Sequence, residues 1–161
     1  MAIIGNAWRH NLSTTDQLKI ADNIDLEKVV VKYHPVTQET FVLYYSPNIK
    51  IVKIKNNTIV DTFDGGYPYT STGNFSLNYD GSKILLIYSF GQAGNNKTLG
   101  YNIDTTTMLH AQAFEFYHDA VIVANVIYSG RDEQYYIAAG QTLYKYNAAT
   151  QSVMYSETFG G

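Results

Sequence analysis

The feature that most constrains the fold is a pattern of four strand-like segments and three tight turns that occurs three times along the chain. The segments are rich in Val, Ile, Tyr, Phe and Thr, and the prolines Pro35, Pro47 and Pro68 fall between them rather than inside them. We therefore expect an all-β protein in which each copy of the pattern forms one four-stranded antiparallel meander.

Each copy is defined by its four segments. In the first copy the segments are 28–34, 39–45, 49–55 and 58–64. In the second copy they are 74–79, 83–89, 98–104 and 107–115, and in the third 121–128, 133–139, 142–148 and 152–159. A longer loop is expected at 91–96, between the second and third strands of the second copy.

The spacing of the turns gives the length of the repeat. The first turns lie near Pro35, Asp80 and Gly130, which are 45 and 50 residues apart. A period in the forties with four strands per unit is typical of β-propeller blades, small twisted sheets that bury their faces against their neighbours. The predicted organisation is therefore about three and a half blades. They are a half blade over 1–25 and blades over 26–66, 67–116 and 117–161.

The N-terminal segment has two interpretations. Strands over 2–10 and 17–24 would form the last two strands of a preceding blade, and this interpretation is favoured. The alternative is a helix, because residues 13–16 have the pattern of a capping box and Leu18, Ala21 and Asp25 have helical spacing.

Composition limits the possible partners and chemistry. Eleven basic side chains stand against 14 acidic ones, so no overall positive field favours nucleic acid or an anionic membrane as a partner. Cysteine is absent, which excludes disulfides and thiolate chemistry. Without a recognisable secretory signal or an apolar run that could span a bilayer, we expect a cytoplasmic protein, or an extracellular one if this is a segment of a longer chain. Four sequons, at Asn11, Asn56, Asn74 and Asn96, leave glycosylation open.

Several motifs resemble those of WD40 and YVTN-type propeller repeats. Asp80-Gly81, followed by the apolar run 84–87, looks like the hairpin between the first two strands of such a repeat. The segment 142–151 is similar to the third strand and turn of a WD40 repeat. His118 looks like the histidine at the start of a blade.

The same resemblance assigns structural roles to two Tyr-Asn pairs. Tyr146-Asn147 and, 45 residues earlier, Tyr101-Asn102 stand at the positions of the Trp-Asp pair of WD40 repeats. The resemblance covers nearly the whole chain, and it implies a propeller fold with Asp80, Gly81, His118 and these two pairs as structural repeat residues.

No sequence pattern points to catalysis, a metal or a cofactor. His118 and Asp119 are adjacent, so on a strand their side chains would point to opposite faces. The four histidines lack the spacing of zinc ligands, and Asp61 with Asp64 beside Gly65-Gly66 is interpreted as a turn between blades rather than a calcium loop. We predict no catalytic residue, no metal and no cofactor.

Four aromatic residues are candidates for binding. Tyr67 and Tyr69 flank Pro68 between two predicted blades, and Tyr45 and Phe90 lie next to predicted turns. Tyrosine suits a binding surface because it buries a large area at small entropic cost and keeps a hydroxyl group.

Three and a half blades do not close a ring, because closed propellers need at least about four blades. We therefore expect a non-enzymatic WD40-like scaffold for protein–protein interaction, whose ring is completed by a second copy, by a larger assembly or by another chain segment. Two alternatives stay open: a ligand-binding or lectin-like propeller module that uses Tyr67 and Tyr69, and a fragment of a propeller enzyme.

Overall fold

The structure is a computed structural model, and it describes residues 8–10, 17–22, 24, 28–68, 72–92, 95–118 and 124–159. Backbone contacts divide the chain into two compact units, Met1–Tyr69 and Thr70–Gly161, called here the N-terminal and C-terminal units. Among the described residues no helix is long and apolar enough to cross a membrane.

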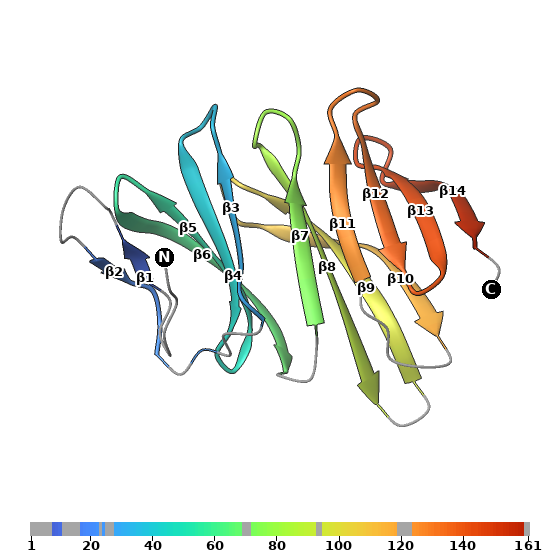
Figure 1. The fold of residues 1–161 in the computed structure, drawn as a ribbon, viewed down its shortest axis with the longest axis horizontal. Helices are drawn as coiled ribbons and strands as arrows, with labels where there is room; N and C mark the ends of the chain where they lie inside the picture. Colours follow the sequence, from blue (N-terminus) through green and yellow to red (C-terminus); the bar gives the residue numbers. More distant parts are fainter. Residues whose placement is uncertain are drawn as a thin grey trace. The chain divides into compact units, whose positions relative to one another are not determined.

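The N-terminal unit contains one four-stranded antiparallel sheet. Its strands follow one another in chain order: β3 (Val30–His34), β4 (Glu39–Tyr45), β5 (Asn48–Lys55) and β6 (Thr58–Pro68) (Figure 1). The predicted turn at Asn56-Asn57 is confirmed. Both residues have positive φ, 49° and 61°, as a two-residue hairpin turn of type I′ requires.

Strand β6 differs from the prediction in two ways. It runs from Thr58 through Pro68 and so does not end at 64. Asp61 and Asp64 therefore lie within the strand and not in a turn between blades. Asp64 pairs with Lys50 on the neighbouring strand at 3.2 Å, and its Oδ1 accepts the Gly66 N–H at 3.1 Å. Lys50 and the Gly66 N–H are thus partners of the Asp64 carboxylate.

A short hairpin precedes this sheet. Strands β1 (Trp8–His10) and β2 (Gln17–Lys19) pair antiparallel, which agrees with the strand interpretation of the N-terminal segment and not with the helix. Farther along, Ile20, Ala21 and Ile24 belong to an apolar cluster with side chains of the middle strands β4 and β5. The side chains from those strands are Val42, Tyr44, Val52 and Ile54.

The C-terminal unit contains two more sheets with the same strand order. The first consists of β7 (Thr72–Leu77), β8 (Lys83–Gln92), β9 (Asn95–Asp104) and β10 (His110–His118). The expected loop at 91–96 is wrong, because Gly91 and Gln92 pair with Asn96 and Asn95 and so extend the hairpin. The last strand starts at His110 rather than at 107, since residues 105–109 form a turn in which Met108 has a φ of 52°.

The final sheet packs face to face on the sheet before it. It consists of β11 (Ala124–Ser129), β12 (Gln134–Ala139), β13 (Thr142–Asn147) and β14 (Ser152–Thr158). Figure 1 shows β11 lying beside β7, and these two innermost strands carry much of the contact between the sheets. Three four-stranded antiparallel meanders with this order make the fold all-β and of propeller-blade type.

The core between β7–β10 and β11–β14 follows from the alternation of side chains along each strand. Leu85 and Ile87 of β8 and Phe114 of β10 point into it from one side. Opposite them lie Ala124, Val126, Tyr135, Ile137, Ala139 and Tyr146 of the last sheet. Every second residue of these strands is apolar, so each sheet can bury one face against the other.

Gly100 is required by this core. A β-carbon at Gly100 would overlap the ring of Phe114, with its Cε2 only 2.6 Å away. The register of β9 and β10 shifts between Gln112 and Phe114, and beyond this bulge Phe114 is the residue paired with Gly100. Glycine therefore creates the space that the Phe114 ring occupies.

We predict that Gly100→Ala destabilises the protein by about 1–3 kcal/mol, because the added methyl group forces the Phe114 ring out of its position. The matched control is Gly130→Ala, whose β-carbon would meet its nearest atom, Tyr79 Cδ2, at an ordinary 3.6 Å. Urea denaturation of both variants measures the effect, and equal midpoints would contradict the packing described for Gly100.

Candidate functional site

The predicted repeat residues Asp80 and Gly81 form the turn between β7 and β8. The Asp80 carboxylate accepts the Ser82 N–H at 2.9 Å, and Gly81 has a φ of 73°, which favours glycine. The Gly81 carbonyl accepts the hydroxyl of Thr105 at 2.7 Å, so this turn is tied to the turn that follows β9.

The equivalence of Tyr101-Asn102 and Tyr146-Asn147 is wrong. Asn147 Oδ1 accepts the N–H groups of the residues two and three positions later, at 2.8 and 3.0 Å. In the preceding sheet Asp104 makes this pattern, with Thr106 and Thr107 at 2.9 and 3.0 Å. Asp104 is therefore the counterpart of Asn147. Equivalent residues in the two sheets are 43 positions apart in the sequence, and not 45 as the two Tyr-Asn pairs suggested.

Asn102 and Tyr146 are instead partners across the two sheets. The Asn102 amide nitrogen on β9 donates to the Tyr146 hydroxyl on β13 at 2.7 Å. Burial raises the pKa of Tyr146, and the bond from Asn102 acts in the opposite direction. Tyr101 lies on the other face of β9, where its ring stacks on Tyr88 with centroids 5.8 Å apart.

Three more hydrogen bonds join the same two sheets. Asn74 donates to Asn125 at 2.7 Å, and the Tyr128 N–H donates to Ser76 Oγ at 3.0 Å. The Tyr135 hydroxyl donates to the carbonyl of Lys83 at 3.5 Å. These bonds fix how the apolar faces align, because each one specifies a particular pair of residues.

Aromatic contacts reinforce this interface at the outer strands. Phe116 of β10 stacks on Tyr144 of β13 with ring centroids 4.0 Å apart, and Phe114 meets Tyr146 edge-on at 5.3 Å. Pairs in these geometries stabilise beyond the area they bury. Tyr144 and Tyr146 therefore serve packing between sheets, and no sequence pattern separates them from tyrosines at a binding surface.

His118 ends β10 and belongs to a line of side chains across three neighbouring strands. Its Nε2 lies 3.0 Å from Thr98 Oγ1, and this hydroxyl lies 2.6 Å from Ser89 Oγ. Although the order of groups resembles a nucleophile with its base, Ser89 is only 1 % exposed and Thr98 is 0 % exposed. A substrate has no access to these hydroxyls in this arrangement, so the line of residues fits a structural role.

The aromatic binding candidates have different outcomes. Tyr45 is not an exposed loop residue. It ends β4 and is 0 % exposed, and the Lys28 ammonium lies 5.6 Å from its ring centroid. Tyr69 lies outside the described residues. Tyr67 belongs to β6 and Phe90 to β8, but their side chains are likewise outside the description, so their binding roles stay predictions.

A second charged group lies on the sheet of the N-terminal unit. Glu39 Oε1 on β4 pairs with Lys53 at 3.2 Å and with Lys55 at 3.4 Å, both from β5. Burial raises the pKa of Glu39, but the bonds and charges of the two lysines and a bond with Thr37 outweigh it, and the pKa falls below its ordinary value. The two lysines are thus engaged by a carboxylate rather than arranged to bind an anion.

The last sheet carries an uncovered face, which we call the outer face. It includes Ile127, Tyr136, Ala138 and Lys145, whose side chains point away from β7–β10. Ile127 is 63 % exposed, whereas Leu85 and Ile87 on the covered face of the preceding sheet are both 0 % exposed. A large apolar side chain in the middle of a strand is therefore left in contact with water.

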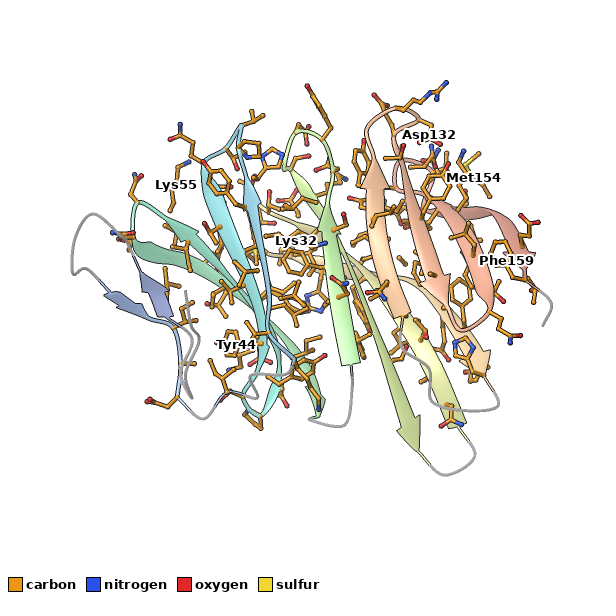
Figure 2. All side chains as sticks on the ribbon, in the orientation of Figure 1. Lys32, Tyr44, Lys55, Asp132, Met154 and Phe159 are labelled. Atoms are coloured by element: carbon orange, nitrogen blue, oxygen red, sulfur yellow. The ribbon has the colours of Figure 1, made fainter. Side chains whose placement is uncertain are left out.

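Two charged side chains on the outer face, Asp132 and Lys145, are paired with each other. Asp132, labelled in Figure 2 at the turn between β11 and β12, accepts the Tyr136 hydroxyl at 2.5 Å and pairs with Lys145 at 3.0 Å. Hydrogen bonds from Ser129, Tyr136 and Lys145 hold the pKa of Asp132 well below its ordinary range. The outer face consequently has no net charge from this pair. At its edge, β14 adds Met154, which is also exposed.

No protein-family model matches the sequence, and no curated protein matches it. A chain in a solved structure described as "Crystal Structure of Mitotic Checkpoint Complex" is similar, with 14 % sequence identity and a TM-score of 0.43. The similarity covers 98 % of this chain and 59 % of that one, so this chain spans less than two thirds of its length.

We predict a coupling free energy of about 1 kcal/mol between Asn102 and Tyr146, the usual size for one hydrogen bond. Asn102→Ala, Tyr146→Phe and the double variant form the cycle, measured by urea denaturation. Asn147→Ala cannot replace Asn102→Ala in this cycle, because Asn147 accepts two hydrogen bonds in the turn after β13. Additive effects of Asn102→Ala and Tyr146→Phe would show that the bond across the sheets is absent in solution.

The lowered pKa of Glu39 predicts a pH-dependent contribution to stability. An ionised Glu39 stabilises the folded state above pH 4.5, its reference pKa, and this contribution is lost as the pH falls through the lower folded-state value. Wild type should therefore exceed Glu39→Gln in free energy of unfolding at pH 7, and the gap should shrink as the pH is lowered below 4.5. A gap that stays constant down to pH 3 would contradict the ion pairs.

Proposed function

We propose that this chain is a non-enzymatic propeller-type scaffold that acts by binding protein, and that a second copy or another chain segment covers its exposed sheet faces. The observation that carries the proposal is the outer face of β11–β14. On it the apolar residues Ile127 and Ala138 are exposed to solvent.

Apolar side chains on an exposed sheet face are in contact with water. A face with large exposed apolar residues is stabilised when another protein surface covers it, at roughly 25 cal/mol for each Å² of apolar area removed from water. The paired charges of Asp132 and Lys145 leave the face without a strong field, so it suits another protein better than nucleic acid or an anionic membrane.

A scaffold role also agrees with the site chemistry. Within the described part of the chain no group of His, Cys, Asp and Glu is placed to hold a metal ion. The line from His118 to Ser89 is closed to substrate, and the charged pairs on the sheets satisfy one another. These observations support protein binding as the activity to test first.

The proposal predicts an assembly of about twice the 18.1 kDa of one chain in light scattering. Ile127→Asp places a charge on the outer face and should shift the measured mass toward 18.1 kDa. The control is Leu109→Asp, which changes a 71 % exposed leucine in the turn after β9 and should leave the assembly intact.

Circular dichroism of both variants verifies that each one keeps its strands. A stable, monodisperse wild-type monomer would count against covering of the exposed sheet faces by a second copy. If Ile127→Asp and Leu109→Asp lower the measured mass equally, the outer face has no special part in assembly.

A further inference from the structure

We infer that two copies of this chain associate head to tail, with strand β3 of one copy packed on the β11–β12 part of the outer face of the other. The inference rests on the proposed function and names the two surfaces that meet. It follows from a comparison of the chain's own hairpins.

The β3–β4 and β11–β12 hairpins are built alike. His34 pairs with Glu39 and Ser129 pairs with Gln134, so each hairpin closes a four-residue turn. The last residue of each turn has a positive φ, 56° at Gln38 in one hairpin and 55° at Glu133 in the other. Counting back from these turns, Val31 and Tyr33 on β3 are the counterparts of Val126 and Tyr128 on β11.

These counterparts differ in what covers them. On β11, Val126 is 1 % exposed and the backbone of Tyr128 donates to Ser76 of the preceding sheet, so both residues belong to the contact between sheets. On β3, Val31 is 51 % exposed and Tyr33 is 58 % exposed. On its edge strand β3, the first complete sheet of the chain therefore exposes the counterparts of two residues with which the last sheet packs on its neighbour.

The outer face of the last sheet supplies the other half of this contact. Asp104 and Asn147 are equivalent by their turns, and the strand register carries the equivalence from there to β7 and β11. In this register Ile127 is the counterpart of Ser76, the residue that receives Tyr128. A head-to-tail contact on the same pattern brings Tyr33 of one copy against Ile127 of the other.

The segment before β3 leaves room for this contact. Ile20, Ala21 and Ile24 pack with residues of β4 and β5, the middle strands of that sheet. Val31 and Tyr33, on the edge strand β3, keep more than half of their surface exposed. In the C-terminal unit the backbones of the two sheets come closest at their inner strands, β11 against β7 and β8.

A second copy is the occupant that these observations favour. On β3 and on the outer face the chain holds counterparts of residues in a contact that it already makes once internally, and Val31, Tyr33 and Ile127 among them are exposed. Val31, Tyr33 and Ile127 carry no charge, and Lys145 on the outer face is paired with Asp132, so the two surfaces meet without repulsion. A contact between different surfaces on two copies is heterologous, and two such contacts close a ring about a two-fold axis.

Site-directed crosslinking tests the inference, because the chain has no cysteine of its own. Full-length Tyr33→Cys and Ile127→Cys variants are mixed under mild oxidation, and crosslinked dimers are quantified on non-reducing gels. Docked cysteines react at millimolar effective concentration, so we expect about tenfold more dimer than from Tyr33→Cys mixed with Leu109→Cys. Val31→Cys with Ile127→Cys, from the same two surfaces, serves if Tyr33→Cys does not fold.

Each outcome decides the matter. A selective Tyr33–Ile127 crosslink between copies supports the inference. Efficient crosslinking of Ile127→Cys with itself would mean that two outer faces pack on each other and would overturn it. If light scattering finds a dimer but neither pair crosslinks, the named surfaces are wrong while the scaffold function stands. A monomeric wild type removes the inference together with covering of the exposed sheet faces by a second copy.

Discussion

The structure depends on one constraint: a four-stranded sheet with apolar residues on both faces is stable only when both faces are covered. The contact between β7–β10 and β11–β14 shows how this chain meets the constraint. Alternating Leu, Ile, Val and Tyr side chains form a buried core between the two sheets. The hydrogen bonds from Asn102 to Tyr146 and from Tyr128 to Ser76 fix how the sheets align. Gly100 leaves the space that the ring of Phe114 fills at the outer strands.

The same constraint gives the exposed surfaces their meaning. Isolated exposed apolar residues are common on proteins and need no explanation. Val31, Tyr33 and Ile127 are different, because each is the counterpart of a residue that lies in a sheet-to-sheet contact elsewhere in the chain. Repetition of one structural unit makes this comparison possible, since every position in one sheet has an internal reference in another.

Sequence reasoning could predict the sheets but not their contacts. Turn residues such as Asn56-Asn57 and Asp80-Gly81, with apolar alternation between them, were sufficient for the strand order. The alignment of Asn102 with Asn147 failed because a Tyr-Asn pair looks the same in both places, whereas the turn geometry depends on an acceptor that Asp104 also provides. Tyr45 was misplaced because a strand buried on both faces has no alternation to separate inside from outside. Comparing the lengths of the β3–β4 and β11–β12 turns would have found the relation of Tyr33 to Tyr128.

A second copy covers β3 and β11 in solution. Hydrogen–deuterium exchange measured across a range of protein concentrations detects this cover, because both are edge strands with one row of amides outside the sheet ladder. We expect exchange in residues 30–34 and 124–129 to slow as concentration rises, while exchange in the turn 105–109 does not change. Exchange in the two strands that is independent of concentration, in a range where the chain is dimeric by mass, would contradict it.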